Sequence, residues 1–318
     1  MTFATAVLLQ LVQLLVMLAV APLLIGWIRW VKSRLVGRRG ASPLQPWRDI
    51  LRLLRKEPVL AHQASPLFRA SPYLIFTAIW FAAALVPAFS TDLALAPTAD
   101  LIALIGFLAS ARFFLALAGM DVGTSFGGLG SSREMLIAAL AEPAMLMVVF
   151  SVAILFRTTS LAEIAAQILS HPVGLRISLA LALISLLMVA IAENARIPVD
   201  NPATHLELTM VHEAMVLEYS GRHLALIEAA SHVKLTLYVG LIACVFFPWG
   251  MATPGQGFAA GLWGLLTFGF KLVAAGTLLA LFETSIAKMR VFRYGEFLGG
   301  ALLLSLLGAI FLYVSRGV

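Results

Sequence analysis

Seven ionisable residues lie inside or at the ends of long apolar segments, where a charge is costly. Glu142, for example, lies eight residues into the segment 134–156, about 12 Å along a helix. A charged side chain in hydrocarbon costs several kcal/mol unless it is paired or hydrated. Most of the seven lie toward the same ends of their segments, which favours a buried polar path over separate structural ion pairs. The residues are Arg112, Glu142, Glu193, Glu228, Lys234, Lys271 and Glu283.

Carboxylates paired with Lys or Arg suit such a path. Burial raises the pKa of a carboxyl group and a nearby cation lowers it, so a modest local field can switch its protonation.

A second acidic region, residues 192–221, reads AENARIPVDNPATHLELTMVHEAMVLEYSG. Thr204 and Glu207 resemble a capping box, so we expect a helix from about His205 to Tyr219. Glu207 and Glu218 are eleven residues apart, close to three helical turns, and would share a face. A solvated loop helix would be equally acidic, so both interpretations stay open. The acidic residues here are Glu193, Asp200, Glu207, Glu213 and Glu218.

The sequence contains no complete metal-binding or cofactor-binding motif. His212-Glu213 begins like a zinc-protease motif, but Val216 stands where the second histidine is required. His205-x-Glu207 has no Cys-x-x-Cys to complete a deaminase site, because Cys244 is the only cysteine. We therefore expect no metal or cofactor in this chain. If the protein belongs to an enzyme complex, we expect it to be a non-catalytic subunit of that complex.

The composition indicates the elements that must position these residues. Of the 318 residues, 61% are hydrophobic and 12% are charged, about half the charged share of a soluble domain. Apolar segments long enough to span a bilayer predict an all-α polytopic protein of about eight transmembrane helices, forming one membrane domain over 1–318. The segments are 4–28, 72–90, 99–119, 134–156, 175–194, 224–249, 258–282 and 297–314.

The basic residues predict the orientation. Placing loops 29–71, 120–133, 195–223 and 283–296 with the adjoining helix ends on one side collects 18 of the 22 Lys and Arg residues. The positive-inside rule makes that side cytoplasmic and both termini periplasmic. The net charge of +6 is then explained by membrane topology, so we expect no nucleic acid partner.

Within the basic loop, QPWRDILRLLRKEP predicts an amphipathic helix in the cytoplasmic interface. Its apolar face would carry Trp47, Ile50, Leu51 and Leu54, with Pro46 in the first turn. The helix could anchor the chain to lipid or dock a partner subunit. The later glycine-rich stretch 121–134 lacks a phosphate-loop ending, and we expect a flexible loop there, with Ser131 and Glu134 as a capping box for the next helix.

Four blocks of the sequence resemble the complex I subunit 1 family, and within it the membrane anchors of group 4 [NiFe]-hydrogenases of the formate hydrogenlyase type. The hydrogenase branch is suggested by residues 200–205 and 210–215. Pro198-Val199-Asp200-Asn201 departs from the Pro-Phe-Asp-Leu of quinone-reactive members, so the family's quinone-site residues are not carried over. The four blocks are Gly37-Arg38-Arg39-Gly40 with Gln45-Pro46 and Asp49; Ala141-Glu142-Pro143; Glu193 to Pro198 with Asp200; and Glu218-Tyr219-Ser220-Gly221.

The resemblance implies a place in a larger complex of the bacterial inner membrane. Partners would be hydrogenase large and small subunits and iron–sulfur subunits, which hold the [NiFe] centre and clusters, together with antiporter-like membrane subunits. The cytoplasmic arm would dock on Arg38, Arg39, Arg48, Arg52 and Arg55. A proton-coupling path would use Arg112, Glu142, Glu193, Asp200, Glu207, Glu213, Glu218, Glu228, Lys234, Lys271 and Glu283.

Two alternatives remain from the sequence. One is the quinone-chamber subunit of a respiratory NADH dehydrogenase. The other is a stand-alone secondary transporter, which inverted repeats and broken helices would favour. Neither feature is detected by inspection of the sequence.

Overall fold

The computed structural model describes residues 3–170, 176–200, 210–287, 289 and 293–316, and this part of the chain is helical with no β-strand. Seven of its helices are long and apolar enough to cross a membrane. They coincide with seven of the predicted spans. The eighth predicted span, 175–194, forms α7, an apolar helix of 17 residues.

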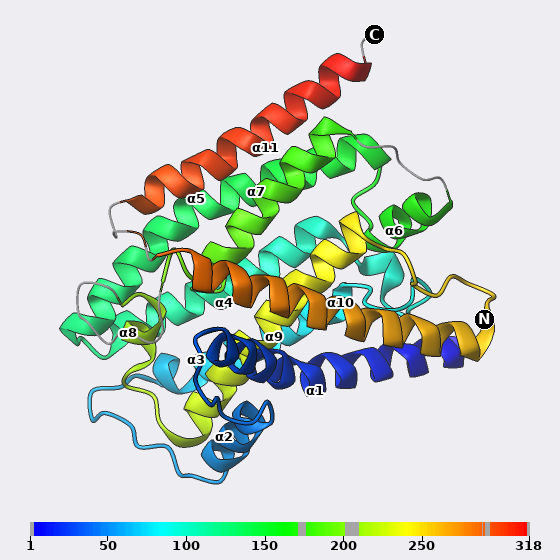
Figure 1. Cartoon of the computed structure of the whole chain (residues 1–318). Helices are drawn as coiled ribbons and strands as arrows, with labels where there is room; N and C mark the ends of the chain where they lie inside the picture. The colour runs from blue at the N-terminus through cyan, green and yellow to red at the C-terminus, as the bar shows by residue number, and fades with distance from the viewer. Residues whose placement is uncertain (1–2, 171–175, 201–209, 288, 290–292, 317–318) are drawn as a thin grey trace.

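The helices fall into two packed groups (Figure 1). In one, α1 packs on α9 and α10, and α3 packs on α4 and α9; in the other, α11 packs on α5 and α7. The pairs α4–α5 and α7–α9 join the groups. The long helices are α1 Phe3–Leu35, α3 Pro66–Leu85, α4 Leu101–Asp121, α5 Ser125–Phe156, α7 Ile177–Glu193, α9 Gly221–Phe246, α10 Gly257–Ser285 and α11 Tyr294–Arg316.

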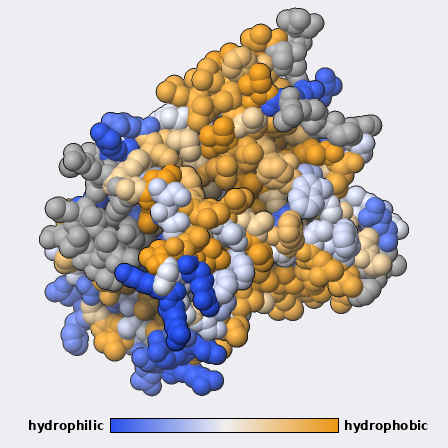
Figure 2. Space-filling model, in the orientation of Figure 1, coloured by the Kyte–Doolittle hydropathy of each residue, from blue (hydrophilic) through white to orange (hydrophobic). Residues whose placement is uncertain are grey.

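The connections carry shorter helices. They are α2 Gln45–Leu54, the 3-10 turn η1 Ala96–Thr98, α6 Leu161–Ser170 and α8 His212–Val216. On the face shown in Figure 2, a large hydrophilic patch lies at the end of the molecule where α2 lies, and hydrophobic residues cover much of the remainder of that face. This distribution fits the predicted location of the basic loop beyond the hydrocarbon. The absolute orientation of the termini stays a prediction.

The amphipathic helix forms as α2, but its packing face differs from the prediction. Pro46 and Ile50 are buried against α1 and α9, and the Trp47 indole Nε1 donates to the Ala19 carbonyl at 2.9 Å. Leu51 and Leu54 are each 46% exposed. Both leucines lie at the edge of the apolar face of α2, next to its basic face, so they remain available to lipid or to a partner.

Two local predictions are wrong. The glycine-rich stretch is helical from Ser125, because Thr124 caps α5 by accepting from the Gly127 backbone N–H. Gly127 and Gly130 allow close packing, since a Cβ at either position would collide with α4 or with the residues around α8. Ser131 is therefore inside α5, where its hydroxyl donates to the Ala116 carbonyl at 2.9 Å.

The second wrong prediction is the helix from about His205 to Tyr219. The described helix in this region, α8, covers only His212–Val216, and 201–209 lie outside the described residues. The capping box of Thr204 and Glu207 therefore cannot be compared with the structure.

The block Glu218-Tyr219-Ser220-Gly221 ties α9 to the connection between α2 and α3. The Ser220 hydroxyl bonds both the N–H and the carbonyl of Val59, at 2.7 and 3.1 Å. Tyr219 stacks on Phe68 with 4.0 Å between ring centroids, and burial raises the pKa of its hydroxyl, which stays neutral. Gly221 has a φ of +52° and lies against the Glu57 carbonyl, so a side chain there would clash.

Candidate functional site

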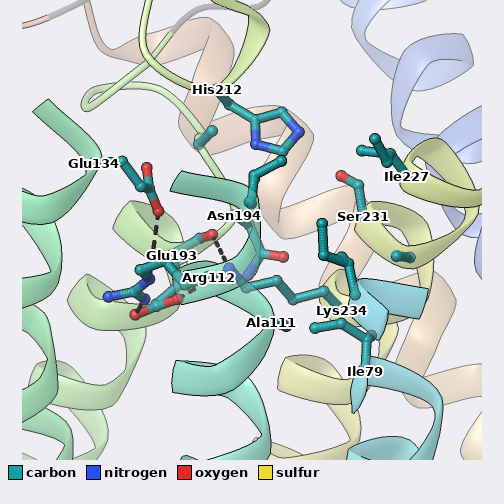
Figure 3. Close-up of a pocket in the computed structure, with 14 residues that line it drawn as sticks. Ile79, Ala111, Arg112, Glu134, Glu193, Asn194, His212, Ile227, Ser231 and Lys234 are labelled. Atoms are coloured by element: carbon teal, nitrogen blue, oxygen red, sulfur yellow. Dashed lines mark hydrogen bonds and ion pairs between the residues drawn. The ribbon is translucent and has the colours of Figure 1, made fainter. Parts of the chain in front are cut away.

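A cluster of ion pairs lies where the two helix groups meet. Arg112 of α4 has a side chain only 3% exposed, and it pairs with carboxylates from two other helices. Its guanidinium lies 3.3 Å from Glu134 and 3.5 Å from Glu142, both on α5, and it also contacts Glu193 at the end of α7. We call Arg112, Glu134, Glu142, Glu193 and Lys234 the central cluster (Figure 3).

Lys234 of α9 completes the central cluster from the opposite side. Its ammonium lies 3.0 Å from the Glu193 carboxylate and donates to the Glu193 backbone carbonyl at 2.6 Å. That carbonyl belongs to the last turn of α7, where carbonyl groups lack helical donors and a cation is favourable. Figure 3 shows Lys234 extended across the site toward Glu193. Glu193, at the end of a helix of the second group, is therefore held by two cations from the first group, Arg112 of α4 and Lys234 of α9.

A cavity of about 50 Å³ adjoins the central cluster. Besides Arg112, Glu134, Glu193 and Lys234, polar side chains from three segments line it: Asn194, His212 and Ser231. The volume is enough for a few water molecules, and the polar lining offers them several partners. Ordered water in such a place can pass a proton between groups that do not touch directly.

The charges of the central cluster do not balance. Three carboxylates, from Glu134, Glu142 and Glu193, face two cations, Arg112 and Lys234. One added proton would make the cluster neutral. Glu142 is the most exposed of the three carboxylates, since its side chain is 40% exposed whereas that of Glu193 is 4% exposed.

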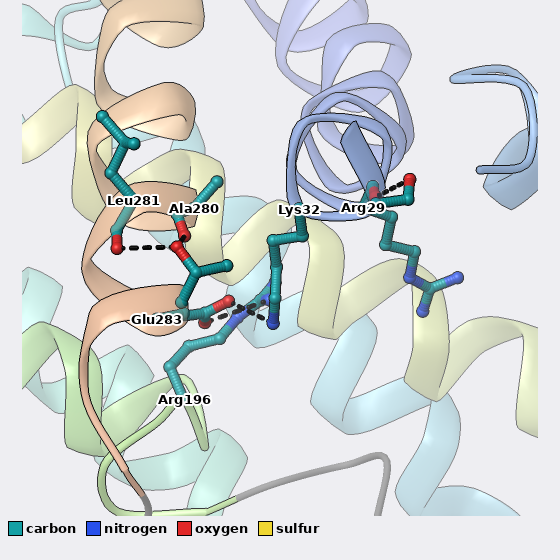
Figure 4. A network of polar contacts seen from close by, with 8 residues as sticks. Arg29, Lys32, Arg196, Ala280, Leu281 and Glu283 are labelled. Carbon is teal, nitrogen blue, oxygen red and sulfur yellow. Dashed lines mark hydrogen bonds and ion pairs between the residues drawn. The ribbon is translucent and has the colours of Figure 1, made fainter. Parts of the chain in front are cut away.

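A second group of ion pairs, the Glu283 network, joins α1, α10 and the loop after α7. Glu283 has a side chain 1% exposed and lies 2.8 Å from Lys32 and 3.6 Å from Arg196. Figure 4 shows both cations converging on Glu283, while the guanidinium of Arg29 points away from it. Burial lowers the pKa of Arg196 from its ordinary value and the charge of Glu283 opposes this. Here the cations outnumber the carboxylate.

Residues of α9 lie between the two groups of ion pairs. His232 lies 3.6 Å from Glu228, and it interacts electrostatically with Arg29 and with Arg196 of the Glu283 network. Glu228 interacts with Glu213 and His212 of α8, and His212 lines the cavity of the central cluster. Glu228 and His232, one helical turn apart on α9, therefore lie within the electrostatic influence of both α8 and the Glu283 network.

Of the eleven residues predicted for the path, the structure brings Arg112, Glu142, Glu193 and Lys234 together. Glu283 belongs to the separate Glu283 network, and Glu228 interacts electrostatically with Glu213. Asp200, Glu218, Lys271 and Glu207 are the remaining four. Asp200 is buried and accepts from the His212 backbone N–H at 3.4 Å. Glu218 is exposed, Lys271 contacts Trp249 instead, and Glu207 lies among the undescribed residues.

The five arginines predicted for docking, Arg38, Arg39, Arg48, Arg52 and Arg55, are all exposed at the α2 end of the molecule. Arg52 pairs with Asp49 at 3.1 Å, which keeps it on the surface of α2.

Three charged members of these networks were not predicted. Glu134 was assigned to a capping box, while Lys32 and Arg196 were counted only as basic loop residues. A signal for Glu134 did exist. It lies eight residues before Glu142, close to two helical turns, so the two carboxylates share a face once α5 is extended to Ser125.

Comparisons with known proteins agree with this architecture. The sequence profile of the family described as NADH dehydrogenase matches residues 8–314. Formate hydrogenlyase subunit 4 of Escherichia coli (strain K12) is 33% identical over 288 residues, covering 90% of this chain and 92% of the relative. Hydrogenase-4 component C of the same organism is 30% identical over 284 residues, covering 89% of each.

A solved structure has the same fold. A chain of the membrane-bound sulfane sulfur reductase, an archaeal respiratory membrane complex, superposes with a TM-score of 0.82 over 96% of this chain and 98% of the other, at 19% identity.

Proposed function

Because the chain belongs to the NADH dehydrogenase family, we propose that it is the membrane anchor and proton-coupling subunit of a formate hydrogenlyase-type or related group 4 [NiFe]-hydrogenase complex. In this proposal it is one membrane domain of the bacterial inner membrane. It links a cytoplasmic electron-transfer arm, which holds the [NiFe] centre and iron–sulfur clusters, to proton-translocating membrane subunits.

The observation that carries the proton-coupling role is the central cluster with its excess carboxylate and adjoining cavity. Purely structural ion pairs in a membrane are favoured when charges balance, since each unneutralised charge is costly. Glu142 combines partial exposure with a 3.5 Å ion pair to Arg112, so it can take up and release a proton while the cluster stays assembled.

The route of coupling follows from the arrangement of the polar residues. The exposed arginines at the α2 end would receive the cytoplasmic arm. A change of charge in the arm would act on α8 and on Glu228, which lie on the path from this end of the molecule. His212 and the cavity water would then transmit it to the central cluster, where Glu193 exchanges its interactions between Arg112 and Lys234.

The quinone-chamber subunit of a respiratory NADH dehydrogenase is the second candidate. The family itself favours it, because NADH-quinone oxidoreductase subunits such as subunit 8 of Rhodothermus marinus, 26% identical, are among the relatives. The departure at residues 198–201 favours the hydrogenase assignment. Identifying the subunits that co-purify with the chain separates the two: nickel-bearing hydrogenase subunits support the proposal, and an NADH-oxidising module contradicts it.

The coupling role is tested with Glu142→Gln, which keeps the size and hydrogen bonding of the side chain but removes its titration. We expect normal amounts of assembled complex and loss of proton translocation, measured as acidification of proteoliposomes per electron pair transferred. Glu296→Gln is the matched control, because Glu296 is a carboxylate 77% exposed at the start of α11. Normal proton translocation by an assembled Glu142→Gln complex would refute the coupling role.

A further inference from the structure

A proline interrupts α3, the helix that packs on both α4 and α9. Those two helices carry Arg112 and Lys234, the cations of the central cluster. Pro72 has no backbone N–H, so the carbonyl of Phe68, four residues earlier, lacks its regular helical donor. Both residues are buried, and a buried carbonyl without a donor is costly in a membrane-spanning helix. The break at Pro72 therefore requires a donor from outside α3.

The Tyr219 hydroxyl is that donor. It donates to the Phe68 carbonyl at 2.9 Å, and the two rings stack with an interplanar angle of 1°. Tyr219 precedes α9 and is 4% exposed. The hydroxyl of Ser71, next to the proline, donates instead to the Leu67 carbonyl at 2.7 Å. Tyr219 thus supplies the hydrogen bond that Pro72 removes.

The interrupted face of α3 continues into the wall of the cavity. One buried face carries, at helical spacing, Phe68, Pro72, Ile75 and Ile79. The two isoleucines line the cavity beside the central cluster (Figure 3). A proline allows a helix to bend, so contacts on either side of the break determine where the rest of the helix lies. The bond from Tyr219 therefore helps to place Ile75 and Ile79.

The proline in α1 has a similar neighbour. Pro22 lies inside α1, and the indole of Trp47 on α2 donates to the carbonyl of Ala19, in the turn before that proline, at 2.9 Å. In both helices an aromatic side chain from another segment donates to the backbone beside the proline. Such donors allow a proline to be tolerated within a membrane-spanning helix.

We propose that Tyr219 is a positioning residue for proton coupling. Its hydroxyl holds α3 at the Pro72 break and thereby keeps Ile75 and Ile79 against the cavity of the central cluster. Tyr219 acts through α3 and does not itself exchange a proton. The inference rests on the proposed function only for the link between this geometry and proton coupling.

The hydrogen bond is tested by a double-mutant cycle on the full chain in detergent. Tyr219→Phe keeps the ring stacked on Phe68 but leaves the carbonyl without a donor, so the thermal midpoint should fall. Pro72→Ala restores a backbone N–H to α3, so adding Tyr219→Phe to Pro72→Ala should lower the midpoint little further. Tyr73→Phe is the matched control, because Tyr73 is the next residue of α3 and is 47% exposed; it should leave the midpoint unchanged.

The positioning role is tested in the assembled complex. Tyr219→Phe should lower the number of protons translocated per electron pair several-fold, whereas Tyr73→Phe should leave it unchanged. Combining Tyr219→Phe with Pro72→Ala should recover the thermal midpoint but not the coupling. The reason is that an uninterrupted α3 satisfies the Phe68 carbonyl without restoring the bend. A hydrogen bond with a purely structural role would recover both properties together.

The place of α3 can also be measured without proton transport. In a chain that carries Cys244→Ala, Ile79→Cys introduces a single thiol into the cavity wall. Its rate of reaction with a small water-soluble thiol reagent reports how tightly α3 closes the cavity. Adding Tyr219→Phe should raise this rate several-fold, because the first turns of α3 are no longer held at the break.

An unchanged midpoint in Tyr219→Phe, or an equal fall with and without Pro72→Ala, would overturn the role of the hydroxyl at the freed carbonyl. Normal coupling in Tyr219→Phe or in the double variant, or an unchanged labelling rate, would overturn the positioning role. Failure of the proposed function is distinguishable. A complex without hydrogenase subunits or proton transport would contradict that function, while the thermal and labelling tests would still decide whether Tyr219 positions α3.

Discussion

The central cluster and the Glu283 network use the same kinds of side chain with opposite balance. The central cluster has three carboxylates and two cations, a partly exposed Glu142 and a cavity. The Glu283 network has one enclosed carboxylate and two cations, one of which, Lys32, is 33% exposed and can reach water. The central cluster therefore carries one negative charge in excess, whereas the Glu283 network carries one positive charge in excess.

The comparison suggests different roles for the two groups of ion pairs. In the proposed function the central cluster changes its protonation, whereas the Glu283 network holds α1, α10 and the loop that follows Glu193 together. Arg196 joins the two, because it lies three residues after Glu193 and contacts Glu283. Mutations in each region should therefore differ in kind, affecting proton coupling in one and stability in the other.

The largest effect is expected from Arg112→Gln. The change leaves three carboxylates with Lys234 as their remaining cation, and losing one partner of a buried ion pair costs about 3–5 kcal/mol. The chain should be recovered from membranes in much lower amount, as measured by quantitative immunoblotting. Arg293→Gln serves as the control, because Arg293 is 64% exposed in its pair with Glu296. Normal chain levels in Arg112→Gln would show that the carboxylates are already protonated and need no cation.

A smaller loss of stability is expected from Glu193→Gln. The amide keeps the side chain in place but removes the negative charge shared by Arg112 and Lys234, which still have Glu134 and Glu142 nearby. Assembly should fall a few-fold and proton coupling should be lost in the complex that does assemble. Size-exclusion yield and proteoliposome acidification measure the two properties separately. Equal yields for Glu193→Gln and Glu142→Gln would remove the distinction between the buried and the exposed carboxylate.

Glu283→Gln should reduce stability without uncoupling. Lys32 can turn to water and Arg196 is 15% exposed, so we expect a loss of about 1.5–3 kcal/mol, the range for a hydrogen bond to a charged group. The thermal midpoint of the complex should fall while protons translocated per electron pair stay unchanged. If this variant uncouples the complex as Glu142→Gln is expected to, the Glu283 network belongs to the proton path and the assignment of different roles is wrong.

How much of this could be predicted from the sequence depends on what determines each feature. Membrane spans follow from long apolar runs, so the positions of seven long helices and α7 were predictable. The start of α5 was not, because glycines that normally favour a loop are required here for close packing against α4 and α8. The relevant neighbours come from other parts of the chain.

The pairing of charges was equally inaccessible. That Glu142 and Glu193 belong to one site could be anticipated from their positions in apolar segments and from family resemblance. The rotation of each helix about its axis decides that Arg112 faces both of them while Lys271 faces Trp249. No local pattern in the sequence encodes that rotation.

The smallest effect on the chain itself is expected from changing Arg48, Arg52 and Arg55 together to Gln. These side chains are exposed on α2, and surface charges contribute about 0–1 kcal/mol each. The chain should therefore keep its level and thermal midpoint, while the soluble subunits should dissociate from isolated membranes at moderate salt. Both groups of ion pairs should remain formed in the membrane part after the cytoplasmic arm is released.

Arg157→Gln, on the predicted opposite side of the membrane, is the control for loss of a cation alone. Full retention of the soluble subunits in the triple variant would mean that α2 anchors the chain to lipid and that the arm docks elsewhere.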